Sequence, residues 1–240
     1  MVRPRNIGRR ELLLHIGRAA FASQFALSAC ATARAQVTGP SMDEPIKLPP
    51  PAEKGTVSVE SALSTRRSVR EFKGGPLTLA EVSQLVWSAQ GETDPAGLRT
   101  APSAGALYPL ELHFVVGEVT ELPAGVYRYQ VDSHQLARVA TGDRRTTLSD
   151  ATFGQGWIAK AAAVMVISAV YDRTTVKYGH RGRLYAHLEA GHVAQNVALQ
   201  AIALGLGMTP VGAFDDQRVK SVVELADREE PLYLLPLGRT

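Results

Sequence analysis

The chain is poor in cysteine: Cys30 is the only one among 240 residues, and it lies near the N-terminus. Disulfide frameworks, CxxC redox motifs and cysteine nucleophiles are therefore excluded beyond that point. Excess charge of one sign is also missing from the main part of the chain. Of 26 basic and 23 acidic residues, residues 1–30 hold five arginines and one glutamate, which leaves 21 and 22. A nucleic-acid-binding protein needs positive charge on its folded body, so this balance argues against nucleic acid as a partner.

The sequence also lacks an uninterrupted apolar run long enough to span a membrane. The best candidate, residues 12–29, contains Arg18, whereas a spanning helix needs about 20 mostly apolar residues. A basic start followed by a modest apolar stretch instead predicts a secretory signal over residues 1–36. Gly8-Arg9-Arg10-Glu11-Leu12-Leu13 resembles a twin-arginine signal, which exports proteins after they fold. We therefore expect an exported protein, periplasmic or in the cell envelope.

Two fates are open for Cys30. Leu27-Ser28-Ala29-Cys30 resembles a bacterial lipobox, in which the cysteine becomes the lipidated N-terminus and attaches the protein to a membrane. The alternative is cleavage after Ala33-Arg34-Ala35, which would remove Cys30. Residues 37–55 contain five prolines and predict an extended tether, so the domain is expected to span residues 56–240.

The domain shows both helical and strand patterns. Helices are predicted over residues 59–67, 79–90, 184–206 and 217–225 from apolar spacing, with Thr78 and Glu81 forming a capping box for the second. The long third helix is rich in alanine and glycine, which allows another helix to pack closely. Strands are predicted over residues 112–116, 125–131, 135–139, 161–169 and 231–237, the second and third forming a hairpin. This mixture predicts an α+β fold.

Two segments carry candidate binding residues. Arg66-Arg67-Ser68-Val69-Arg70-Glu71-Phe72 gathers three guanidinium groups and a hydroxyl, donors that suit phosphate oxygens, and Arg239 is a further candidate. The alternative is a solvated basic face. Pro102-Ser103-Ala104-Gly105-Ala106-Leu107-Tyr108-Pro109 is a loop of small residues that would let the backbone approach a flat ligand.

The one sequence feature that suggests a metal site is incomplete. Glu189-x-x-His192 occurs once, whereas di-metal chemistry in helix bundles needs this motif twice with further carboxylates. We therefore predict no metal and expect His192 to be a buried, hydrogen-bonded histidine.

Taken in order, five stretches resemble the nitroreductase family of flavin-dependent oxidoreductases, and most closely its branch of SagB-type (thiazole/oxazole-forming) dehydrogenases. The resemblance covers nearly all of residues 56–240. The stretches are Arg66–Phe72, Pro102–Pro109, Glu189-Ala190-Gly191-His192-Val193-Ala194-Gln195-Asn196, Pro210-Val211-Gly212-Ala213-Phe214-Asp215-Asp216 and Pro236-Leu237-Gly238-Arg239.

The resemblance implies an α+β subunit with a mixed sheet flanked by helices, and an obligate homodimer with FMN at the subunit interface. Arg66, Arg67, Ser68 and Arg70 would hold the phosphate and the polar edge of the flavin, with Arg239 completing the phosphate site. Pro102, Ser103 and Ala104 would reach the flavin of the partner subunit. Pro210, Val211, Gly212 and Ala213 would lie along the ring system.

For the reaction, the resemblance implies that Lys177 and Tyr178 assist proton removal while FMN takes a hydride. The alternative is a Lys-Tyr pair in a surface loop. We predict an FMN-dependent oxidoreductase with a ping-pong mechanism acting on a small-molecule or peptide-derived substrate. The rival prediction is a non-catalytic exported flavin-binding or interaction lipoprotein.

Overall fold

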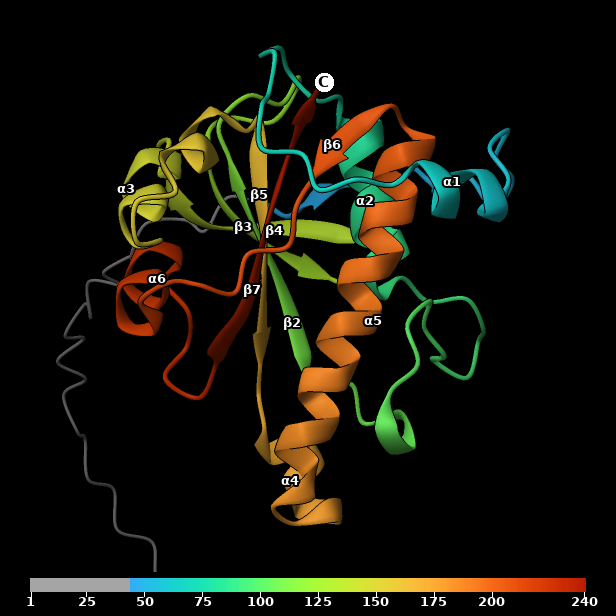
Figure 1. Cartoon of the computed structure of the whole chain (residues 1–240). Helices are drawn as coiled ribbons and strands as arrows, with labels where there is room; N and C mark the ends of the chain where they lie inside the picture. The colour runs from blue at the N-terminus through green and yellow to red at the C-terminus, as the bar shows by residue number, and fades with distance from the viewer. Residues whose placement is uncertain (1–43) are drawn as a thin grey trace, which may run out of the picture. The chain divides into compact units, whose positions relative to one another are not determined.

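The computed structural model describes residues 44–240, so the predicted signal peptide, Cys30 and residues 37–43 lie outside the described residues. Within that range the fold is built on a seven-stranded sheet in the order β1-β4-β3-β2-β5-β7-β6 (Figure 1). The strands are β1 (Ile46–Lys47), β2 (Leu110–Val116), β3 (Gly125–Gln130), β4 (Gln135–Thr141), β5 (Ala163–Ala169), β6 (Leu206–Met208) and β7 (Glu230–Arg239).

The sheet is antiparallel throughout the described strands, so the expected mixed sheet is wrong. The predicted β3–β4 hairpin is present, and β2, β3 and β4 form a meander. The chain then returns through β5, which runs beside β2 in the opposite direction. The mixed sheet was implied by the family resemblance alone. Local sequence patterns locate the strands but do not give the relative direction of strands that pair across long connections.

Helices cover both faces of the sheet. They are α1 (Val59–Thr65), α2 (Leu79–Gln90), α3 (Arg145–Asp150), α4 (Asp172–Tyr178), α5 (Arg181–Ala203) and α6 (Asp216–Val223), with 3-10 turns η1 (Ala104–Ala106) and η2 (Gly156–Lys160). Because side chains alternate along a strand, Phe114 and Met165 pack in the core under α2 and α5. Their neighbours Val115 and Val164 pack in a second core under α3, η2 and α6. Central strands β2 and β5 are buried at every residue for this reason.

Helix α5 is the longest element and has two distinct faces. Ala186, Ala190, Ala194 and Ala198 are buried against the sheet and α2, as the small-residue pattern predicted. On the opposite side Leu184 and Leu188 are 43% and 53% exposed. His192 lies on this exposed side of the subunit, so the expected buried histidine is wrong. The helix also ends at Ala203, and Leu206 belongs to β6.

The second half of the predicted tether is part of the domain. Ile46 pairs with Leu136 of β4, and Leu48 is buried in the core. The carbonyl oxygen of Pro49 accepts a 2.6 Å hydrogen bond from Ser83 Oγ on α2. Prolines are compatible with the end of a short edge strand, so proline content alone misplaced the domain boundary. None of the helices in residues 44–240 is long and apolar enough to cross a bilayer.

Candidate functional site

The first group of predicted residues lies together at the end of the sheet near β6. We call Arg66, Arg67, Ser68 and Arg70 the arginine cluster. Helix α1 ends at Thr65, and the chain then runs alongside β6, where Val69 N donates a 3.1 Å hydrogen bond to the carbonyl oxygen of Met208. Thr209 Oγ1 donates a 2.6 Å hydrogen bond to the carbonyl oxygen of Val69. These bonds hold the arginine cluster beside the segment Pro210–Ala213.

The arginine cluster carries positive charge that the described residues do not neutralise. Arg67 and Arg70 are exposed, and the hydrogen bonds of Arg67 Nη1 go to the backbone carbonyls of Ser64 and Arg66. No acidic side chain in residues 44–240 forms an ion pair with Arg66, Arg67 or Arg70. Uncompensated guanidinium groups on one short segment suit a phosphate, which carries about two negative charges near neutral pH.

An aromatic side chain that the sequence analysis missed borders this cluster. The Arg70 guanidinium lies 5.9 Å from the ring centroid of Trp157, and the Phe72 ring lies 6.4 Å from the same ring. Trp157 belongs to η2, a short element without a clear apolar period, so nothing in the pattern placed it near residue 70.

Arg239 reaches the same region but is already paired. Lys73 N donates to the carbonyl of Arg239, which brings the end of β7 beside the segment that follows the arginine cluster. The Arg239 guanidinium, however, forms a two-bond ion pair with Glu81 and donates to the carbonyl of Pro76. Burial raises the pKa of Glu81, but the hydrogen bonds from Arg239 and Thr78 outweigh this and leave that pKa below its ordinary value.

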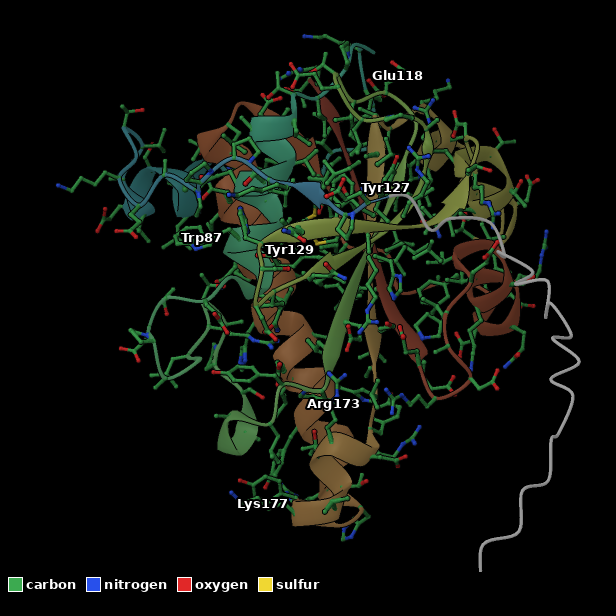
Figure 2. The ribbon with its side chains drawn as sticks, turned by 180° about the vertical axis from the view of Figure 1, so that it is seen from behind. Trp87, Glu118, Tyr127, Tyr129, Arg173 and Lys177 are labelled. Atoms are coloured by element: carbon green, nitrogen blue, oxygen red, sulfur yellow. The ribbon has the colours of Figure 1, made fainter. Side chains whose placement is uncertain are left out.

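The second group of predicted residues, the loop cluster, consists of Pro102, Ser103, Ala104, Lys177 and Tyr178. Lys177 and Tyr178 lie in the last turn of helix α4, which the sequence analysis did not predict, and not in a loop (Figure 2). Lys177 is exposed, so the alternative of a surface Lys-Tyr pair stays open. A methyl group added at Gly105 would lie 2.7 Å from Tyr178 Oη and 2.9 Å from Lys177 Nζ. The ends of the Lys177 and Tyr178 side chains therefore lie against the loop at Gly105.

The backbone of this loop is unusual. Gly105, Ala106 and Tyr108 have positive φ angles of 64°, 53° and 44°. Residues other than glycine rarely adopt such angles, and they persist only where the surroundings enforce them. A 3.0 Å hydrogen bond from Tyr108 N to Ser103 Oγ closes the loop and supplies part of that enforcement.

A buried network of polar side chains packs next to the loop cluster. Gln90 Nε2 donates a 3.2 Å hydrogen bond to Glu189 Oε1, and Arg99 Nη1 donates a 3.1 Å bond to Gln90 Oε1. Burial raises the pKa of Glu189, although hydrogen bonds from Ser103 and Gln90 act in the other direction. Glu189 is thus a member of this network. No group of three or more His, Cys, Asp or Glu side chains in residues 44–240 is arranged to hold a metal ion.

The two clusters lie at opposite ends of helix α5. Helix α4 leads into its N-terminal end and β6 follows its C-terminal end (Figure 1). With 23 residues, α5 spans about 35 Å. One subunit therefore does not bring the arginine cluster and the loop cluster into a single site.

These features define an α+β protein with an antiparallel sheet, an uncompensated arginine segment at one end and a strained loop under a Lys-Tyr pair at the other. Residues 63–239 match the nitroreductase family model, and the chain belongs to that family.

Particular relatives agree with this assignment. The chain is 45% identical over 183 residues to MJ1384 of Methanocaldococcus jannaschii, a protein named as a nitroreductase; the match covers 76% of this chain and 91% of that protein. A crystal structure from Ralstonia eutropha, also described as a nitroreductase, is 28% identical with a TM-score of 0.73 over 83% of this chain and 91% of that one.

A more distant relative bears on the branch of the family. McbC of Escherichia coli, the microcin B17-processing protein, is 28% identical over 158 residues, which are 63% of this chain and 58% of McbC. The match to the family and the relatives including McbC confirm the resemblance to nitroreductases and their SagB-type branch.

Proposed function

We propose that the protein is an FMN-dependent oxidoreductase that transfers a hydride to or from an organic substrate. The observation that carries the proposal is the arginine cluster: three arginines on one segment, without acidic partners in residues 44–240, beside a stretch of small residues. Arg66, Arg67, Ser68 and Arg70 would bind the phosphate and the polar edge of the flavin. Gly212 and Ala213 are exposed and small, which suits close approach by a flat ring.

The loop cluster enters the same site in a homodimer. Pro102, Ser103 and Ala104 of one subunit would contact the flavin held by the arginine cluster of the other. The exposed leucines Leu184 and Leu188 on α5, together with Val59 and Leu63 on α1, support association because exposed apolar surface favours burial against a partner. The proposal therefore needs two copies of the chain for each complete site.

FMN, when bound, supplies hydride acceptance and donation. The role we assign to Lys177 and Tyr178 is to take up or return the proton that accompanies hydride transfer. Lys177 Nζ lies 5.4 Å from the centroid of the Tyr178 ring, so the two groups are close enough to act on one substrate. Arg239 would add to the phosphate site only if it shared or left its ion pair with Glu81.

We further propose that the protein is exported folded with its flavin, and that Cys30 is either lipidated or removed. NAD(P)H is confined to the cytoplasm, so oxidation of a substrate with oxygen or a quinone as acceptor fits an exported protein better than NAD(P)H-driven reduction. Anaerobic stopped-flow mixing with NADPH tests this direction. Slow or absent flavin bleaching agrees with it, and rapid bleaching contradicts it.

The function is tested by comparing the wild-type protein with Lys177→Gln and Tyr178→Phe variants. We expect both variants to retain FMN and dimerise while their turnover falls by about 10²-fold or more, the size typical of losing a positioned acid or base. Bound FMN that no donor or acceptor cycles in the wild type would instead identify a non-catalytic flavin-binding protein.

A further inference from the structure

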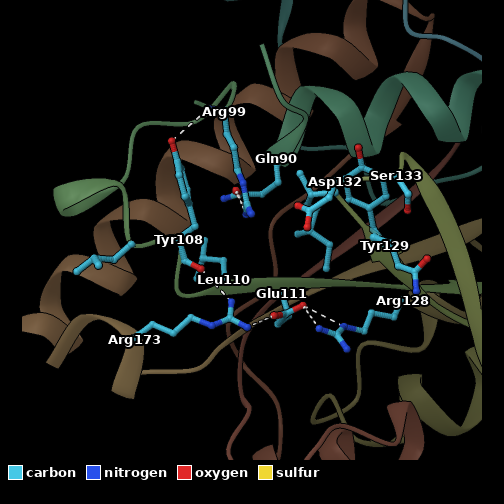
Figure 3. A pocket seen from close by; sticks show the side chains of 14 residues that line it. Gln90, Arg99, Tyr108, Leu110, Glu111, Arg128, Tyr129, Asp132, Ser133 and Arg173 are labelled. Carbon is cyan, nitrogen blue, oxygen red and sulfur yellow. Dashed lines mark hydrogen bonds and ion pairs between the residues drawn. The ribbon is translucent and has the colours of Figure 1, made fainter. Parts of the chain in front are cut away.

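A cleft outside both clusters opens where β3 separates from β2. Strand β2 pairs with β5 from Leu110 to Val116, but its pairing with β3 starts only at His113, opposite Arg128. A cleft of about 610 Å³ occupies the gap beside Leu110–Leu112 (Figure 3). That volume lies within the range of pockets that hold small organic ligands, about 300–1,000 Å³.

Two arginines are fixed at the floor of this cleft by one carboxylate. Arg128 approaches Glu111 Oε2 through Nε at 3.0 Å and Nη2 at 2.9 Å, and Arg173 pairs with Glu111 Oε1 from the other side. Arg173 Nη1 also donates to the carbonyl of Tyr108. The Glu111 side chain is only 9% exposed, whereas those of Arg128 and Arg173 are 47% and 34% exposed. The floor thus presents two positioned guanidinium groups against one negative charge.

A third arginine enters from the opposite wall. The Arg99 guanidinium stacks 4.3 Å from the Tyr108 ring centroid, and its Nη1 donates to Gln90. Its Nε is buried and has no hydrogen-bond partner within residues 44–240. A buried charged donor without an acceptor is destabilising, and an oxygen supplied by a ligand would remove that penalty.

We propose that this cleft binds the anionic oxygens, carboxylate or phosphate, of a small organic ligand, with Arg99, Arg128 and Arg173 as the donors. Asp132 is the other acidic residue of the lining, so three positive charges face two negative ones. Guanidinium forks bind such oxyanions through paired hydrogen bonds. No residue of the arginine cluster or the loop cluster lines the cleft, so binding to it can be measured without FMN.

The test is a titration of the full-length, ¹⁵N-labelled chain with two probes, glutarate and inorganic phosphate. The readout is the Nε–H cross-peak of Arg99, assigned by its loss in Arg99→Lys, together with the dissociation constant from calorimetry. We expect a saturable shift of that peak and a dissociation constant about tenfold higher in Arg128→Gln, because one charge-assisted hydrogen bond is lost. Arg218→Gln removes the same charge from an exposed position on helix α6 and serves as the matched control.

Saturation by glutarate with the expected Arg128→Gln effect supports a carboxylate ligand, and saturation by phosphate alone supports a phosphate ligand. If Arg128→Gln does not fold, Arg99→Lys provides the same comparison of affinities. A flat titration with both probes, or an equal loss of affinity in Arg218→Gln, overturns the proposal.

Discussion

Arg239 at the end of β7 and Glu81 in the first turn of α2 form a two-bond ion pair across 158 residues of sequence. Nη1 lies 2.6 Å from Oε1, and Nη2 lies 2.8 Å from Oε2. Glu81 also accepts hydrogen bonds from Thr78 N and Oγ1 as the glutamate of the capping box. One carboxylate therefore caps α2 and ties it to the last strand, which gives Arg239 a structural role beside the phosphate-binding role predicted from the sequence.

Replacing Glu81 by Gln is expected to lower the free energy of unfolding by about 1 kcal/mol at pH 7. The pKa of Glu81 is lowered in the folded state, so its contribution is complete above the pKa of the unfolded chain. It is lost as the pH falls through the folded-state pKa. Urea unfolding of both proteins at a series of pH values from 7 downwards checks this. A difference that stays the same as the Glu81 carboxylate becomes protonated would show that the ion pair is not its source.

Replacing Arg67 by Ala is expected to weaken FMN binding without unfolding the protein, because its present hydrogen bonds go to nearby backbone carbonyls. Loss of a charged hydrogen bond, about 1.5–3 kcal/mol, corresponds to roughly 10- to 100-fold weaker binding. Fluorescence titration with FMN measures this. Arg228→Ala, an exposed arginine between α6 and β7, is the control and should bind normally. Equal flavin affinity in Arg67→Ala would remove Arg67 from the site.

Replacing Gly105 by Ala tests whether the loop positions Lys177 and Tyr178. Comparison with a second glycine of positive φ separates this effect from the backbone strain that any such substitution causes. The new methyl group would displace Tyr178 Oη and Lys177 Nζ, so turnover should fall about tenfold or more while FMN stays bound. Gly142 also has a positive φ, 83°, but open space around it. Gly142→Ala should therefore lose a similar amount of stability, roughly 1–2 kcal/mol, and keep its turnover. Turnover is measured with the donor or acceptor that cycles the wild-type flavin; equal effects of the two changes would refute the positioning role.

Replacing Arg9 and Arg10 together by Lys is expected to keep the protein in the cytoplasm, since the twin-arginine signal is read by a receptor. Fractionation of cells that express the wild-type and variant chains, with immunoblotting of each fraction, measures this. Unchanged export of the variant would rule out the twin-arginine route and leave the general secretory route.

Much of the fold could be predicted from local patterns. Helix α2 begins at Leu79 and ends at Gln90 as predicted, because the Thr78–Glu81 capping box defines its start. Helix α4 was missed because Asp172–Tyr178 is only seven residues long and mostly polar, with no apolar period. The direction of β5 relative to β2 depends on tertiary pairing across the β3–β4 hairpin, which local patterns do not encode.

The types of residue in the candidate site could be predicted from the sequence. The contacts that these residues make with distant side chains could not. The density of arginine over residues 66–70 is visible in the sequence and is enough to mark the arginine cluster. Nothing local indicated that Glu81 would pair with Arg239, or that Glu111 would join Arg128 and Arg173. These contacts join residues more than 15 positions apart, so they follow from the sheet order and not from sequence spacing.

The visible absorption spectrum of the purified full-length protein, with chromatography of the ligand released on heating, tests the central claim most directly. We predict the absorption bands of an oxidised flavin and about one FMN released per subunit, as expected for one arginine cluster in each chain. A colourless protein that also fails to take up added FMN would contradict the proposed flavin site and, with it, the proposed reaction.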